Sequence, residues 1–197
     1  MSDARTVGTD RSARRQPSSL AAVLFGTLVR SDGRDAGPAY MLLDAARDPR
    51  IYARLTELGD GVHARSLYQG DVGESLAHVS PYLLALREGE PNSCWFAEAG
   101  FRQSWGLFIG TPIGFDELRR HLRKFNIVYR EDGVPLVFRF YDPRVLRQFL
   151  PTCTAGELRR FFGPIESFLT ETAAADALVR FTLRGDELMQ TRLPVPV

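Results

Sequence analysis

The 197-residue chain is poor in the residues that build disulfide frameworks and metal sites, with two cysteines and three histidines. Cys94 and Cys153 lie far apart and in no CxxC pair, so neither a disulfide framework nor a zinc site is indicated. His63, His78 and His121 share no HExxH or HxxxH spacing. We therefore predict no metal site, and the small number of cysteines fits a reducing, cytoplasmic location.

Nucleotide-binding loops, an excess of charge and a long apolar run are also lacking. Neither GxxxxGK[ST] nor GxGxxG occurs, so the usual phosphate cradles are excluded and no cofactor is predicted. The formal net charge is only +1 at pH 7, which does not suggest a nucleic-acid partner. The apolar run from Leu20 to Val29 is too short to cross a bilayer, so no membrane partner is expected.

Catalytic motifs are incomplete where they occur at all. Gly73-Glu74-Ser75-Leu76-Ala77 is the nearest approach to a nucleophile elbow, but it lacks the second glycine and follows a glycine-rich loop where a strand should lead in. Only Asp116 and His121 follow Ser75 in triad order, and they are too close together to form an ordinary acid and base pair from separate loops. A serine hydrolase is therefore not predicted.

The most informative stretch of the sequence lies between Phe138 and Leu146, where aromatic, charged and apolar residues stand side by side. The alternation through residues 136–141 predicts a strand with phenylalanines on one face and Arg139 and Tyr141 on the other. An arginine between two phenylalanines is expected either on a polar face or in an ion pair. This stretch is the first candidate for a functional site.

A helix start follows this predicted strand. Asp142 stands at the N-cap position, where its carboxylate can accept from free N–H groups, and Pro143 has the fixed φ that suits the first helical position. The same triplet occurs earlier as Asp48-Pro49-Arg50. The flanking residues do not keep register, so the two triplets indicate two separate helix starts and not an internal repeat. We expect Asp142 to act as a helix cap rather than as a catalytic carboxylate.

Strand-like and helix-like segments alternate along the chain, which predicts an α/β fold. We expect a mixed sheet with flanking helices and a small, partly helical C-terminal lobe. The Asp132-Gly133 pair predicts a tight hairpin turn. The predicted divisions are a disordered leader (1–19), an α/β core (20–150), and the C-terminal lobe with its loose tail (151–197).

Several landmarks occur in an order that resembles a known family. They are Leu43-Asp44-Ala45-Ala46 with Asp48-Pro49, Ser66-Leu67-Tyr68-Gln69-Gly70, Ser80-Pro81-Tyr82-Leu83, Trp105-Gly106, His121-Leu122-Arg123, Phe138 to Leu146, and Phe161-Phe162-Gly163-Pro164-Ile165. Together they resemble the type VI secretion adaptor family, the effector chaperones also called Tap or TEC proteins, usually encoded beside a spike-tip VgrG and a toxic effector. The most specific piece is Phe138 to Arg144.

The resemblance implies a non-enzymatic adaptor that binds a cognate secreted effector protein and aids its loading onto the secretion spike, with VgrG as a further partner. The family supplies no catalytic residues to carry over. We expect Arg139, Tyr141, Asp142 and Arg144 to bind the partner. Two alternatives stay open: a hydrolytic enzyme with a site around Asp44, Asp142 and Arg139 at the strand ends, and an immunity-type protein that neutralises a toxin.

Overall fold

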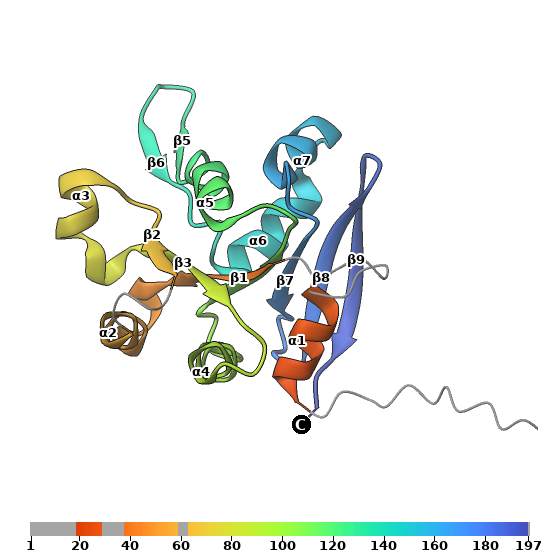
Figure 1. Ribbon diagram of the computed structural model, residues 1–197. Helices are drawn as coiled ribbons and strands as arrows, with labels where there is room; N and C mark the ends of the chain where they lie inside the picture. The colour runs from red at the N-terminus through yellow and green to blue at the C-terminus, as the bar shows by residue number, and fades with distance from the viewer. Residues whose placement is uncertain (1–18, 29–37, 59–62, 197) are drawn as a thin grey trace, which may run out of the picture.

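A seven-stranded sheet runs through the middle of the molecule (Figure 1). The computed structural model describes residues 19–28, 38–58 and 63–196. The strands, in spatial order, are β2 (Ala64–Ser66), β3 (Pro81–Leu86), β1 (Ala39–Asp44), β4 (Gly106–Gly110), β7 (Ser167–Glu171), β8 (Ala177–Arg184) and β9 (Glu187–Pro194). The central strands β1, β4 and β7 are buried along their whole length.

The α/β class is confirmed, but the prediction of a mixed sheet is wrong, because every neighbouring pair of strands runs antiparallel. β1, for example, lies between β3 and β4 and is antiparallel to both. Alternation of strands and helices is typical of parallel βαβ units. Periodicity reports which residues are buried, however, and not the direction in which the chain returns to the sheet.

Helices cover both faces of this sheet (Figure 1). Because successive side chains of a strand point to opposite faces, Met41 and Leu43 of β1 enter one core cluster while Tyr40 and Leu42 enter the other. One face is covered by α1 (Leu20–Leu28), α2 (Pro49–Glu57) and α4 (Pro91–Gly100), and the other by α5 (Phe115–Arg123), α6 (Pro143–Phe149) and α7 (Ala155–Phe162). The remaining helical segments are α3 (Gly70–Ser75) and the 3-10 turns η1 (Ala45–Arg47), η3 (Ala77–Val79) and η4 (Leu150–Thr152).

The C-terminal residues extend the same sheet. β7 pairs with β4, with Phe108 opposite Leu169 and Ile109 opposite Phe168, so the sheet continues across the predicted division at residue 150. Residues after 165 form the three strands β7, β8 and β9. The predicted leader lies outside the described residues except for Ser19. None of the described helices is long and apolar enough to span a bilayer.

A short hairpin stands apart from the main sheet, with strands β5 (Ile127–Tyr129) and β6 (Pro135–Val137) (Figure 1). The predicted Asp-Gly turn is confirmed: the N–H of Gly133 donates to the C=O of Arg130, and Gly133 has the positive φ of +82° that this turn requires. The strand predicted to continue to Tyr141 ends at Val137. The segment after it curves back into the body of the protein.

Candidate functional site

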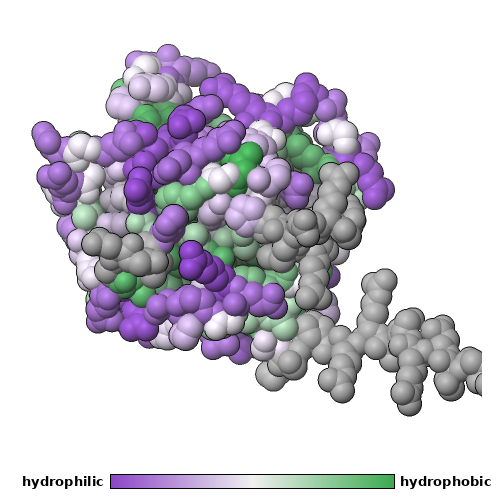
Figure 2. Space-filling model, viewed as in Figure 1, coloured by the Kyte–Doolittle hydropathy of each residue, from purple (hydrophilic) through white to green (hydrophobic). Residues whose placement is uncertain are grey.

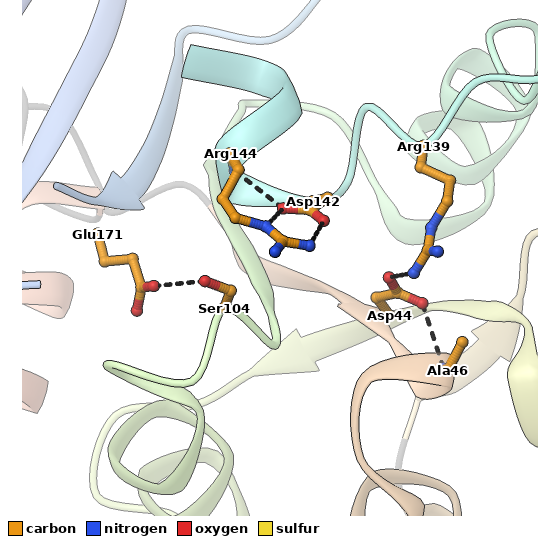
Figure 3. A network of polar contacts seen from close by, with 7 residues as sticks. All are labelled: Asp44, Ala46, Ser104, Arg139, Asp142, Arg144 and Glu171. Carbon is orange, nitrogen blue, oxygen red and sulfur yellow. Dashed lines mark hydrogen bonds and ion pairs between the residues drawn. The ribbon is translucent and has the colours of Figure 1, made fainter. Parts of the chain in front are cut away.

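Three buried carboxylates lie at one end of the main sheet (Figure 3). Asp44 is the last residue of β1, Asp142 precedes α6, and Glu171 is the last residue of β7. These three residues are 0%, 3% and 8% exposed, respectively. We call these three side chains the carboxylate row. Burying a carboxylate costs free energy unless it is paired and hydrogen-bonded, so the partners of the row define the site.

The Asp44 carboxylate is held by one backbone N–H and one arginine. Its side chain accepts from the N–H of Ala46 at 3.2 Å and caps η1, and it also accepts from the guanidinium of Arg139. The Asp44 side chain is 1% exposed and that of Arg139 is 44% exposed, so the ion pair is closed at its acidic end and open at its basic end. The hydrogen bond with Asp44 raises the pKa of Arg139. The prediction that Arg139 is either paired or on a polar face is confirmed, and its contact uses one nitrogen only.

Asp142 is the predicted N-cap of α6, accepting from the N–H of Arg144 at 2.9 Å. The Arg144 side chain folds back so that Nε lies 3.0 Å from Oδ1 and Nη2 lies 2.6 Å from Oδ2, a bidentate contact (Figure 3). Burial of the carboxyl opposes its ionisation, but the hydrogen bonds and charge of Arg144 outweigh this and lower the pKa of Asp142. Arg144 stays half exposed.

The first Asp-Pro-Arg triplet folds in the same way. Asp48 caps α2 by accepting from the N–H of Arg50 at 2.9 Å, and the Arg50 side chain returns to the same carboxylate with Nη2 2.6 Å from Oδ2. The interpretation as two helix starts is confirmed. Local capping chemistry produces both copies.

Tyr141 does not lie on an exposed face with Arg139, and that prediction is wrong. The N–H of Asp142 donates to the C=O of Arg139, so the chain turns here and the alternation of a strand is lost. The Tyr141 residue is 2% exposed and packs edge-on against Phe140. Burial raises the pKa of its hydroxyl, and the hydrogen bond that this hydroxyl donates to Tyr68 raises it further. Tyr141 is therefore a core residue that a partner cannot reach in this conformation.

Glu171 was not singled out by sequence reasoning. Its carboxylate accepts from the N–H of Arg102 at 2.6 Å and from the hydroxyl of Ser104 at 2.7 Å. Both residues have positive φ, +67° for Arg102 and +54° for Ser104, a conformation that is costly for a residue with a side chain. Glu171 thus stabilises the turn that leads into β4. Because the partners are 67 to 69 residues apart, no local pattern could have revealed the contact.

The other predicted candidates do not join this row. His121 is buried, with Nε2 2.8 Å from the C=O of Phe161, and burial lowers its pKa. Ser75 ends the helix α3, and does not occupy the turn from a strand to a helix that a nucleophile elbow needs. Asp116 is exposed and lies 3.5 Å from Arg65. No group of acidic, histidine and cysteine side chains suited to a metal ion occurs among the described residues.

A cavity of about 850 Å³ lies elsewhere on the sheet. It is lined by Tyr40, His63, Arg65 and Phe115, among others, at the beginning of β1. Asp44 lies at the opposite end of that strand. The carboxylate row is therefore a surface of exposed arginines above buried acids, separate from this cavity.

Comparison with known proteins gives one family. Residues 39–160 match the family described as a domain of unknown function, DUF4123. No curated protein and no solved structure gives a significant match to the chain. The matched residues include Asp44, Asp142, both Asp-Pro-Arg triplets and the hairpin, and they end before Glu171. Since the match covers more than half of the chain, the protein belongs to the DUF4123 family.

Proposed function

We propose that the protein is a non-enzymatic adaptor that binds a cognate secreted effector protein and aids its loading onto the type VI secretion spike. Its action would be in the cytoplasm, before secretion, with VgrG as a further partner. The family match and the resemblance of the landmark motifs to Tap and TEC proteins support this proposal. The description of the family states no function, so the proposal needs support from the site itself.

The observation that carries the proposal is the orientation of the ion pairs in the carboxylate row. Asp44 and Asp142 turn their oxygens inward, while Arg139 and Arg144 remain 44% and 52% exposed. Exposed guanidinium groups held in place by buried acids can donate further hydrogen bonds without losing rotamer freedom on binding. Arginine is among the residues enriched at protein interfaces.

The hydrolytic alternative draws less support from the same geometry. Both carboxylates already have partners. Asp44 pairs with Arg139, and Asp142 pairs with Arg144 and caps its own helix. Arginine lowers the pKa of Asp142, which favours a permanently charged cap over a proton donor at neutral pH. The exposed arginines fit an immunity-type protein as well as an adaptor, so an experiment is needed to distinguish these two functions.

The test is co-expression with the full-length product of each effector gene encoded beside this one, followed by size-exclusion chromatography. We expect one stable complex at micromolar concentration. An adaptor leaves the bound effector toxic once released, whereas an immunity protein abolishes its activity in the complex. Separate elution with every candidate would overturn the proposal.

Variants assign the binding to the carboxylate row. Arg144→Gln should weaken the complex because it removes an exposed fork. Arg159→Gln is the matched control, since Arg159 is also half exposed and also pairs with an aspartate, Asp186, but at the opposite end of β8. Equal binding by both variants would remove Arg144 from the interface while leaving the adaptor role intact.

A further inference from the structure

The hairpin concentrates the exposed large apolar side chains of the molecule. Every residue from 127 to 137 is exposed. Among the described residues, Leu76 is the one large exposed apolar side chain that lies outside it. Those within it are Ile127, Val128, Tyr129, Val134, Leu136 and Val137. Figure 1 shows the hairpin projecting from the body beside α5.

Both faces of the hairpin are apolar. In the antiparallel register, Ile127 faces Val137 on one side, and Val128 faces Leu136 on the other. A strand pair of a folded protein usually buries one face and presents polar residues on the other. Two-stranded hairpins are also marginally stable in water when nothing packs against them. The sequence of this hairpin therefore fits a state in which another segment covers it.

One edge of the hairpin is open to a further strand. The N–H of Arg130 donates to the C=O of Val134, and the N–H of Phe138 donates to the C=O of Asn126. Because antiparallel bonding alternates along a strand, the backbone groups of Ile127 and Tyr129 point away from β6. Within the described part of the chain, neither residue has a backbone hydrogen bond outside the hairpin. On the outer edge of β6, Pro135 has no N–H to offer.

The edge of the main sheet is protected in a way that β5 is not. The edge strand β9 carries exposed Glu187, Gln190 and Arg192. Charged and polar side chains on an edge strand discourage pairing with another chain. β5 consists of Ile127, Val128 and Tyr129 and has no such residue. β5 thus lacks the protection that β9 has.

Two cations precede β5 in the chain. Arg120 and Lys124 are exposed, one helical turn apart in the last part of α5 and the residue after it, just before β5. Neither takes part in an ion pair with another described residue. Like charges at this spacing repel each other, and an acidic side chain from outside would relieve the repulsion.

We propose that the free edge of β5 receives an extended apolar segment of the effector as a third strand, with an acidic residue of that segment beside Arg120 and Lys124. This inference rests on the proposed adaptor function and names its docking element. Main-chain hydrogen bonds would provide affinity, and the alternating apolar side chains would pack against the two faces.

Two other occupants fit the hairpin less well. A second copy of this chain, pairing edge to edge through strands of three residues, would bury far less than the roughly 1,200 Å² that a stable interface needs. The N-terminal residues 1–18 are rich in arginine and contain few large apolar side chains, so they match neither the faces of the hairpin nor its cations.

The test measures the affinity for the effector identified by co-expression, by calorimetry, for four variants. Tyr129→Pro removes an N–H that points away from β6. A proline, Pro135, already stands at the position directly opposite. Tyr129→Lys places a charge on the apolar edge. Tyr129→Ala removes the side chain alone. Leu76→Lys is the control, because it introduces the same charge at the exposed apolar residue outside the hairpin.

We expect Tyr129→Pro and Tyr129→Lys to raise Kd by at least about tenfold, as loss of an anchor does, with a smaller effect of Tyr129→Ala and none of Leu76→Lys. Equal affinity for all four variants overturns the docking element and leaves the adaptor function standing. If the wild type binds no effector, both proposals fail. A wild-type dimer that Tyr129→Pro dissociates would show that a second copy is the occupant and would also overturn the inference.

Hydrogen exchange on the wild type gives a result that does not depend on how the variants fold. Addition of the effector should slow exchange at the outward amides of Ile127 and Tyr129. The amide of Val128 points toward β6 and is already bonded within the hairpin, so its exchange should change less. Protection of Val128 alone, or of none of the three, would contradict strand addition.

Discussion

The two Asp-Pro-Arg turns have the same local structure in different surroundings. In both, the aspartate caps a helix and the arginine folds back onto its carboxylate. The Asp48 side chain is 18% exposed, whereas that of Asp142 is 4% exposed. The difference arises from the residues that precede each cap. The same triplet therefore supplies a surface helix start in one place and a buried anchor in the other.

The position two residues before each cap shows this difference most directly. Phe140 stands there in the second turn, fully buried and perpendicular to Phe161 with ring centres 5.5 Å apart. Ala46 stands there in the first turn and is exposed. A core residue thus stands two positions before the second cap, and an exposed residue stands two positions before the first.

The largest expected effect tests that distinction. Phe140→Ala should lower the free energy of unfolding by about 3–5 kcal/mol, because it leaves a cavity among packed aromatic rings. Ala46→Ser at the equivalent exposed position should change it by less than about 0.5 kcal/mol. Urea denaturation followed by fluorescence measures both. Similar losses for the two variants would show that the turns are supported in the same way.

Removing the caps should give the next largest effect. Asp142→Ala and Asp48→Ala should each cost about 1 kcal/mol of stability through the lost cap. Asp142→Ala should lower stability more than Asp48→Ala, because N–H groups that are buried cannot form a replacement hydrogen bond with water. Asparagine at either position should restore most of the loss. The comparison would be wrong if Asp48→Ala proved the more destabilising change.

The pH dependence of stability should differ between the same two sites. The pKa of each aspartate is lowered in the folded state, so its contribution is present above the unfolded pKa of about 3.9 and is lost as the pH falls through the folded pKa. Asp142→Asn should remove more of the stability lost on acidification than Asp48→Asn. Thermal melts between neutral pH and pH 3 provide the measurement.

His121 adds an earlier step to the same curve. Burial lowers its pKa, so the folded state favours the neutral ring, and stability begins to fall as the pH drops below the unfolded value of about 6.5. His121→Gln should flatten the curve between pH 6.5 and the acidic step. A step near pH 6 that persists in this variant would have to come from another group.

The smallest effects are expected for the two arginines. Arg144→Lys should cost less than about 1 kcal/mol, since the pair is half exposed and solvent screens it. Arg50→Lys should have no larger effect on the melting temperature, because Arg50 is more exposed still. A large loss in Arg144→Lys alone would show that its bidentate geometry, and not its charge, holds Asp142.

Local chemistry allowed the sequence to predict the caps and the hairpin turn. The residues that determine each of these features lie within a few positions of one another. The direction of the strands, the burial of Tyr141 and the role of Glu171 depend on contacts between distant segments. The alternation at Tyr141 looked like a strand because only the turn at Asp142, which three-dimensional packing imposes, distinguishes the two conformations.

The pairing of β4 with β7 determines how the chain can be divided. A fragment ending with the family match at residue 160 would keep β4 and lose its neighbour, so Phe108 and Ile109 would lie on a bare strand edge. The same cut would remove Glu171 and release the two strained residues before β4. Such a fragment would be prone to aggregation, because an apolar unpaired edge is a template for other chains. The limits of the sequence family are therefore not the limits of an independently folding unit.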